Sequence, residues 1–226
     1  MPAGPQRARV SFLPSRHGFA FANSWPPAPA ITLPTPVRSI GIGNAAAGLC
    51  GGMVFGALDY WQAELRPPES RPAPGSPLYR YLVRRQIASW HLPSGVARYY
   101  RWMNLPDGDD GPASRTVSVQ WPKIQASLDA GVPAVLGLVT VASANPALLR
   151  HNHQALAFGY TVRRSEVSVL VYDPNSGPDD GVAIWFSTTQ RAFRHNLTLD
   201  WPVRGFFLTP YSRAIPPLPE RTQQDG

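Results

Sequence analysis

The sequence predicts an α+β domain in which helices come first and antiparallel strands follow. Residues 48–131 carry apolar side chains at helical spacing, whereas residues 133–211 contain short apolar runs typical of strands. The chain has 26 Pro among 226 residues, more than twice the usual share of about 5%. Since Pro disfavours long uninterrupted helices, this content disfavours a helical bundle or a coiled coil. A run of helices followed by a run of strands favours the α+β class.

Apolar spacing predicts four helices in the first half. The first covers 54–65 and must end at Arg66-Pro67-Pro68. After a Pro-rich linker, a second helix is expected over 79–90 and a third over 96–103, capped by Ser94. The turn-rich DGDDG loop precedes a fourth helix over 121–128, with Pro122 in its first turn and Gly131 beyond its end.

Five apolar segments predict the sheet in the second half. They are separated by polar or turn-forming residues, and Arg163 to Glu166 has the length of a hairpin connection. We expect the first helix to pack against this sheet. The predicted strands are 133–141, 154–162, 167–174, 182–189 and 205–211.

Composition divides the chain into an arm, a domain and a tail. Residues 1–38 form a Pro-rich N-terminal arm, whose Phe12, Phe19, Phe21 and Trp25 suggest that parts of it pack onto the domain. Residues 39–213 form the domain itself. The stretch 214–226 is expected to be a flexible C-terminal tail.

The charge pattern argues against a dedicated nucleic-acid-binding protein. The net charge is +7, from 21 Lys and Arg against 14 Asp and Glu, but the only Lys is Lys123 and the Arg residues are scattered. Non-specific attraction to polyanions is expected, but no recognition motif predicts a specific nucleic-acid partner. Neither a signal peptide nor 18 consecutive uncharged apolar residues are found. We therefore expect a soluble, cytoplasmic protein without a membrane span, leaving non-classical export and the oligomeric state open.

The single cysteine, Cys50, is the first candidate for chemistry. One Cys excludes an intrachain disulfide and argues against a Cys-based zinc site. Cys50 stands at the start of the first helix, where unpaired amides favour a thiolate and so a nucleophile. Gly48, Gly51 and Gly52 could leave the backbone uncovered for a substrate carbonyl. The alternative is that Cys50 is a small buried residue and the glycines permit close helix packing.

His153 and Asp173 are the second and third candidates. His153 shares a strand face with Ala155, Ala157 and Gly159, which would let the Cys50 helix approach closely. Asp173 ends the next strand, where a carboxylate could orient the imidazole; Asn175 is the alternative orienting residue, and a plain turn signal is the alternative role of Asp173. His151, His153 and Asp173 as metal ligands are disfavoured because no third His accompanies them. No metal and no cofactor are expected.

This order of Cys, His and Asp resembles the papain-like cysteine peptidases. In pattern it is most similar to the peptidases that remove double-glycine leaders from bacteriocins and to related bacterial proteins, over roughly residues 40–210. The resemblance implies that Cys50 (GLCGGM) is the nucleophile, His153 (NHQALAFGY) the general base and Asp173 (VYDPN) the orienting acid. Papain-like enzymes usually place an oxyanion-binding Gln six residues before the Cys. Asn44 occupies that position here, with the same amide donor on a shorter arm, and would act with the Cys50 amide.

The expected function is hydrolysis of a peptide or amide bond in a peptide or protein substrate. Three alternatives stay open: a transferase or deamidase using the same residues, a non-catalytic binding module of the same fold, and a basic polyanion-binding protein. The tryptophans Trp102, Trp121, Trp185 and Trp201 are expected to be core residues rather than a binding platform.

Overall fold

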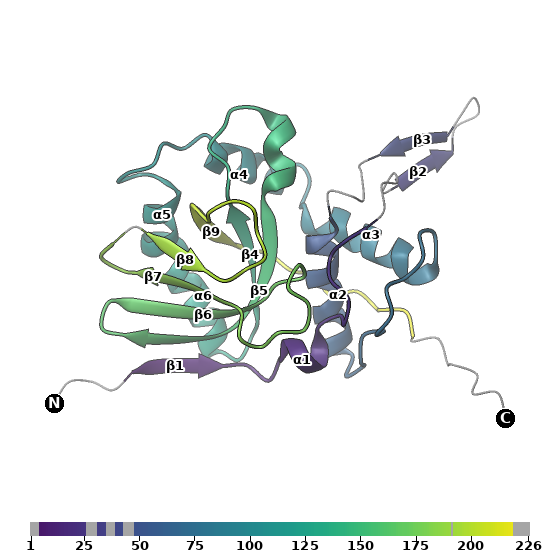
Figure 1. The fold of residues 1–226 in the computed structure, drawn as a ribbon, viewed down its shortest axis with the longest axis horizontal. Coiled ribbons are helices and arrows are strands. Elements are labelled where there is room, and N and C mark those ends of the chain that lie inside the picture. Colours follow the sequence, from purple (N-terminus) through teal and green to yellow (C-terminus); the bar gives the residue numbers. More distant parts are fainter. Residues whose placement is uncertain (1–4, 26–30, 35–38, 43–47, 191, 219–226) are drawn as a thin grey trace.

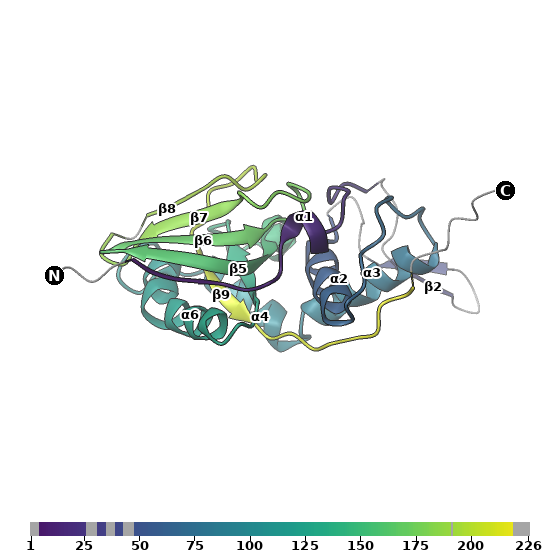
Figure 2. The same ribbon diagram turned by 90° about the horizontal axis from the view of Figure 1, so that it is seen from below.

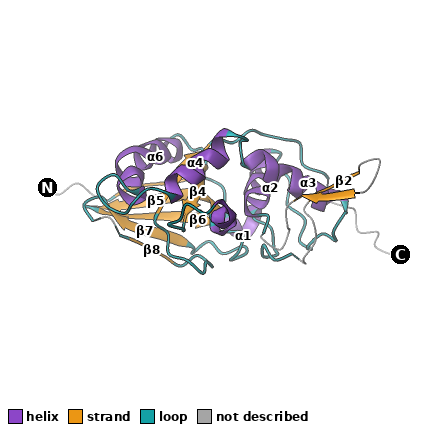
Figure 3. Cartoon of the chain, turned by 90° about the horizontal axis from the view of Figure 1, so that it is seen from above, coloured by secondary structure: helices purple, strands orange, loops and turns teal. Residues whose placement is uncertain are grey.

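An antiparallel sheet and a set of helices form the α+β architecture that the sequence predicts (Figure 1). The computed structural model describes residues 5–25, 31–34, 39–42, 48–190 and 192–218. Seven strands form the main sheet, in the order β8-β7-β6-β5-β4-β9, with β1 also paired to β5. Figure 3 shows the strands of the main sheet gathered at one end of the molecule and α2, α3 and β2 at the other.

The five predicted strands are all present. They are β4 (Ala134–Val139), β5 (His153–Arg163), β6 (Glu166–Tyr172), β7 (Ala183–Ser187) and β9 (Gly205–Thr209). Four further strands were not predicted because they are short and carry no long apolar run. They are β1 (Gln6–Arg9), β8 (Phe193–His195) and the two-stranded sheet of β2 (Ile31–Pro34) and β3 (Ser39–Ile42).

Strand β5 is the central strand of the sheet and begins with His153. Its first residues pair with β4 and its later ones with β1, so these two strands lie end to end along one side of β5. Strand β6 pairs along its other side through the hairpin Arg163↔Glu166, where Arg164 has a positive φ of 56°. This hairpin brings the end of β6 back beside the start of β5. Asp173 therefore arrives next to His153.

The predicted helices are present, with shifted boundaries. Helix α2 (Cys50–Gln62) begins at the cysteine itself, and α3 (Pro77–Ser89) is capped by Ser76. Helix α4 (Ser94–Met103) includes Ser94 as its first residue, so the prediction that Ser94 caps it is wrong: its hydroxyl donates to the His91 carbonyl at 3.1 Å. Two short helices were not predicted, α1 (Pro14–His17) and η3 (Pro146–His151).

The fourth predicted helix, α6 (Trp121–Asp129), is the end of a longer helical segment. Helix α5 (Pro112–Arg115) and the π-helical turn η2 (Thr116–Gln120) lead into it without a break. The sequence did not indicate this extension because it is mostly polar and contains β-branched residues, which favour helix weakly. Tertiary contacts hold it instead, since the Thr116 hydroxyl bonds to the carbonyl and amide of Phe206 in β9, each at 2.8 Å.

Helices pack on both faces of the sheet, and this corrects one expectation. Ala155 and Ala157, on the strand face of His153, pack with α6 rather than with the cysteine helix. Figure 2 shows α6 lying along one face of the sheet. Helix α2 contacts the opposite face, at Leu156 and Phe158. The first helix thus packs against the sheet as predicted, but through the residues that alternate with the small ones.

Buried polar contacts hold α2 in place. The Asp59 carboxylate and Arg85 of α3 form an ion pair at 2.6 Å, with both side chains buried. Asp59 also accepts hydrogen bonds from the Tyr211 hydroxyl at 2.6 Å and the Ala214 amide at 2.8 Å. A buried carboxylate with this many donors is expensive to move. The position of α2, and with it Cys50, is therefore fixed against α3 and the C-terminal segment.

The described part of the N-terminal arm belongs to the core. Phe12, Phe19, Phe21 and Trp25 are buried, and all join the hydrophobic cluster around α2. Of the predicted tail, residues 219–226 lie outside the described residues, while the Pro217 carbonyl accepts a hydrogen bond from Tyr60 at 2.8 Å. No helix in the described ranges is long and apolar enough to cross a membrane.

Candidate active site

A cleft of about 520 Å³ opens where α2, the start of β5 and the loops after β6 and β8 meet. The three candidate residues are brought together here: Cys50 and His153 line the cleft, and Asp173 lies behind the histidine. The other lining residues are Asn23, Gly48, Thr140, Arg150, His151, Asn152, Asn175, Thr198, Leu199, Asp200 and Trp201.

Cys50 is the first residue of α2 and is partly exposed to the cleft. Helix starts leave amides without intrahelical acceptors, and two neighbouring ones are taken by side chains. The Leu49 amide donates to Asn23 Oδ1 at 2.6 Å, and the Gly52 amide donates to Gln86 Oε1 at 2.8 Å. In the described part of the chain the Cys50 amide has no such acceptor. It is therefore the helix-start amide best suited to hold an oxyanion.

The groups around Cys50 favour the thiolate form of its side chain. Burial on its own would raise its pKa. The charge of His153, a hydrogen bond to His153 and the amides of Gln154 and Gly51 outweigh that effect and lower the pKa. Each of these groups stabilises the negative sulfur rather than the neutral thiol.

The glycines after the cysteine serve packing, so the expectation that they uncover the backbone for a substrate is wrong. A Cβ on Gly51 would collide with Ser89 Oγ and Gln154 Oε1, and a Cβ on Gly52 would collide with the Leu82 carbonyl of α3. Both positions face protein, because α2 and α3 approach each other closely here. Gly48 differs: its φ of +89° requires a glycine in the turn that leads into α2.

The His153 imidazole is held by a buried carboxylate. Its Nε2 contacts Asp173 Oδ1 at 2.7 Å, with the side chains 5% and 0% exposed. Asp173 also accepts from the Asn175 amide at 2.9 Å, the Ser176 hydroxyl at 2.9 Å and the Thr198 amide at 3.0 Å. Burial would raise the pKa of Asp173, but its contact with His153 and these donors lower it. Asp173 is therefore the residue placed to orient the ring.

Negatively charged groups on both sides of the His153 imidazole favour its protonated form. Burial alone would lower the pKa of His153, but the Cys50 thiolate and Asp173 more than reverse this and raise it to about 10. Because Nε2 faces the carboxylate, Nδ1 is the nitrogen left for the sulfur. The arrangement favours a thiolate–imidazolium pair at pH values between the lowered pKa of Cys50 and the raised pKa of His153.

Asn23 is a site residue that the sequence reasoning missed. Besides accepting from Leu49, its Oδ1 accepts from Trp25 Nε1 at 2.8 Å, while its Nδ2 donates to Asn175 Oδ1 at 3.0 Å. Asn23 thereby ties the turn before Cys50 to the loop after Asp173. Asn175, the alternative orienting residue, bonds to Asn23 and to the Thr198 carbonyl and not to the imidazole. The one available signal was the pair of aromatic residues flanking Asn23, which marks a packed segment.

The remaining predicted residues have different outcomes. His151 lines the cleft, but the described residues contain no group of three or more His, Cys, Asp or Glu placed to hold a metal. Asn44, the predicted oxyanion residue, lies outside the described residues. Trp102 and Trp121 are buried as expected, whereas Trp201 is 48% exposed and lines the cleft, so its assignment to the core is wrong.

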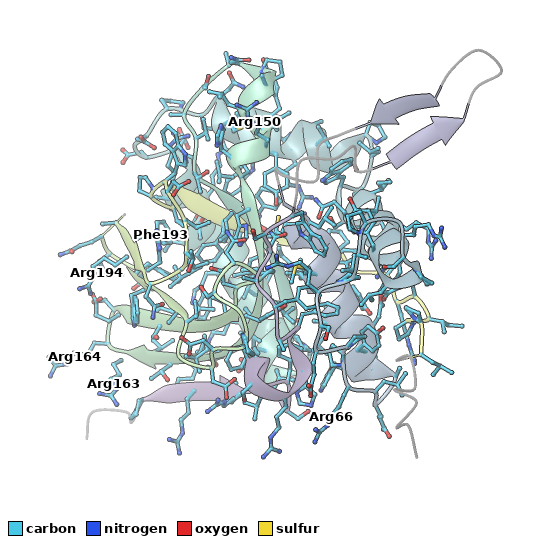
Figure 4. The ribbon with its side chains drawn as sticks, turned by 45° about the vertical axis from the view of Figure 1, so that its right-hand side comes forward. Arg66, Arg150, Arg163, Arg164, Phe193 and Arg194 are labelled. Atoms are coloured by element: carbon cyan, nitrogen blue, oxygen red, sulfur yellow. The ribbon has the colours of Figure 1, made fainter. Side chains whose placement is uncertain are left out.

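The arginines that give the chain its charge project from separate parts of the molecule. Figure 4 shows Arg163, Arg164 and Arg194 at the outer edge of the sheet, with Arg66 and Arg150 at opposite ends of the view.

Comparisons with protein-family models, with curated proteins and with solved structures found no match. The function must therefore be argued from the geometry of the cleft.

Proposed function

We propose that the chain is a papain-like cysteine hydrolase that cleaves a peptide or amide bond with Cys50, His153 and Asp173. The observation that carries the proposal is one imidazole held between a buried carboxylate, at 2.7 Å, and the thiol of a helix-start cysteine at a cleft. A thiolate, an acid–base group and an orienting acid in this order are what nucleophilic acyl chemistry requires. The resemblance in motif order to the papain-like peptidases supports the same reading.

The reaction would proceed in two halves. The Cys50 thiolate attacks the carbonyl carbon, and the C–O electrons move to oxygen, which the Cys50 amide stabilises. As the tetrahedral intermediate collapses, the C–N bond breaks and the His153 imidazolium donates its proton to the leaving amine, which leaves a thioester. Neutral His153 then takes a proton from water, whose hydroxide releases the acid and restores the thiolate. Asn44 as a second oxyanion donor remains a prediction.

The first experiment measures alkylation of the sole thiol. We expect iodoacetamide to label Cys50 rapidly at neutral pH, no labelling in Cys50→Ala, and slower labelling in His153→Gln. His17→Gln serves as the control, since His17 is partly buried and does not line the cleft. Unchanged labelling kinetics in His153→Gln would overturn the ion pair.

The second experiment measures turnover. A peptide library digested with the protein and read by mass spectrometry should show cleavages that are absent with Cys50→Ala. Hydroxylamine added to the digest should cleave the thioester to a hydroxamate, and this product would reveal the acyl-enzyme intermediate. A thiol pKa near the ordinary value of about 8.5, together with no cleavage, would favour a binding module instead.

A further inference from the structure

Trp201 is an unusual residue to find in this cleft. Among the described residues, the large apolar side chains that are well exposed are Leu92, Tyr100, Val119, Val132, Trp201, Ile215 and Leu218. Of these, Trp201 alone lines the cleft that holds Cys50 and His153. An exposed indole beside a nucleophile offers a large apolar surface that a bound ligand can cover.

The indole lies against a second ring. The rings of Trp201 and His151 have centroids 5.7 Å apart at an interplanar angle of 57°. His151 ends η3, two residues before His153, and its carbonyl accepts from the Thr140 hydroxyl at 2.8 Å. Together the two rings form an aromatic wall on the approach to His153.

The loop that carries Trp201 is anchored to the orienting acid. The Thr198 amide donates to Asp173 Oδ2 at 3.0 Å, and the Thr198 hydroxyl bonds to Ser176 at 2.9 Å. The Thr198 carbonyl accepts from Asn175 Nδ2 at 3.0 Å. Trp201 is thus three residues from a point fixed on Asp173. The carboxylate that orients His153 therefore also anchors the loop that carries Trp201.

The charges of the cleft do not select an ionic side chain. Apart from the catalytic residues and His151, the ionisable residues that line it are Arg150 and Asp200, which carry opposite charges. A substrate side chain in contact with the wall would therefore be chosen by shape and apolar area.

From these observations we infer that Trp201 and His151 form a subsite for an apolar, planar side chain next to the scissile bond. This inference rests on the proposed function and specifies its substrate class: peptides with an aromatic residue at that place. Covering roughly 55 Å² of the exposed indole surface is expected to favour an aromatic over a small substituent by roughly tenfold.

The test uses two probes of the same reactive group, N-benzyl chloroacetamide and N-ethyl chloroacetamide. Each alkylation rate of Cys50 is divided by the rate of the same probe with free cysteine. We expect the benzyl probe to be favoured by roughly tenfold in the wild type, this preference to vanish in Trp201→Ala, and part of it to survive in Trp201→Phe. Val119→Ala, which removes an apolar side chain 46% exposed outside the cleft, should retain it fully.

The outcomes separate this inference from the proposed function. A wild type that reacts quickly with both probes without preference, or a preference unchanged in Trp201→Ala, would overturn the subsite while leaving the catalytic pair intact. Equal loss of preference in Val119→Ala would also overturn it. Slow alkylation by both probes at neutral pH would instead count against the thiolate–imidazolium pair.

Discussion

Replacing Asp173 by Asn tests the central electrostatic argument with the smallest change of shape. The carboxylate accepts hydrogen bonds from four donors. Its Oδ1 accepts from His153 and the Asn175 amide, and its Oδ2 accepts from the Ser176 hydroxyl and the Thr198 amide. An amide keeps one oxygen and places an NH₂ group where the other oxygen stood. The substitution therefore removes the negative charge beside the imidazole and turns one acceptor into a donor.

The magnitude follows from these contacts. A hydrogen bond to a charged group contributes about 1.5–3 kcal/mol, and one pKa unit corresponds to about 1.36 kcal/mol. Without the carboxylate, the pKa of His153 should fall from about 10 by roughly one to two units. The pKa of Cys50 should rise, because its cationic partner is less stable. The Thr198 amide would face a donor in a buried site, which costs about 1–3 kcal/mol of folding free energy.

The assay is ultraviolet absorbance of the thiolate as a function of pH, with Cys50→Ala as the blank. We expect the thiolate to appear at a higher pH in Asp173→Asn than in the wild type. In an NMR titration, the imidazole signals of His153 should show loss of its proton at a lower pH, so that the thiolate–imidazolium window narrows from both sides. Asp180→Asn is the matched control, since that carboxylate accepts two hydrogen bonds from Ser15 outside the cleft. A window of unchanged width in Asp173→Asn, with the protein folded, would refute the reasoning.

Three further predictions concern the surroundings of Cys50 and His153. Asn23→Asp places a negative charge in the cleft, on the amide of the residue before Cys50, and should raise the pKa of Cys50 by about one unit; an unchanged thiolate titration would show that Asn23 does not influence the sulfur. Gly52→Ala forces a Cβ into a backbone carbonyl of α3 and should lower the free energy of urea unfolding by about 1–3 kcal/mol. Gly56→Ala places its Cβ 3.1 Å from a flexible leucine methyl and should lower it less. Equal losses in the two variants would contradict the packing role of Gly52. Because the pKa of His153 is raised, its contribution to the free energy of unfolding is complete below about pH 6.5 and is lost as the pH rises through about 10. The difference in urea midpoint between the wild type and His153→Gln should therefore shrink over that range. A difference that stays constant with pH would argue against this linkage.

Much of the fold followed from local patterns in the chain. Helical spacing located α2, α3, α4 and α6, and apolar runs located five strands, because burial of one face imposes a period on the sequence. The short elements escaped detection, since β1 and β8 are held by pairing to neighbours rather than by an apolar pattern. The extension of α6 escaped for a similar reason: Thr116 is held by β9, far away in the chain.

The candidate site divides in the same way. The chain alone indicated a cysteine at a helix start, a histidine beginning a strand and an aspartate ending the next, since each is a statement about one element and its end. That Asp173 rather than Asn175 contacts the imidazole depends on the register of the β5–β6 hairpin and on the donors of the loop around Thr198. Those contacts join segments with no local relation in the sequence.

Only the tertiary structure determined which residues surround Cys50 and His153. Asn23 reaches the site because the N-terminal arm packs against α2, and Trp201 reaches it because its loop is tied to Asp173. In the sequence, Gly51 and Gly52 suggest a backbone left uncovered for a substrate. In the structure, side chains and the backbone of α3 fill the space beside them. Periodicity reports which face of an element is buried, but which partner buries it is set by contacts between distant segments. The chain therefore specified the reactive groups, and the packing specified what surrounds them.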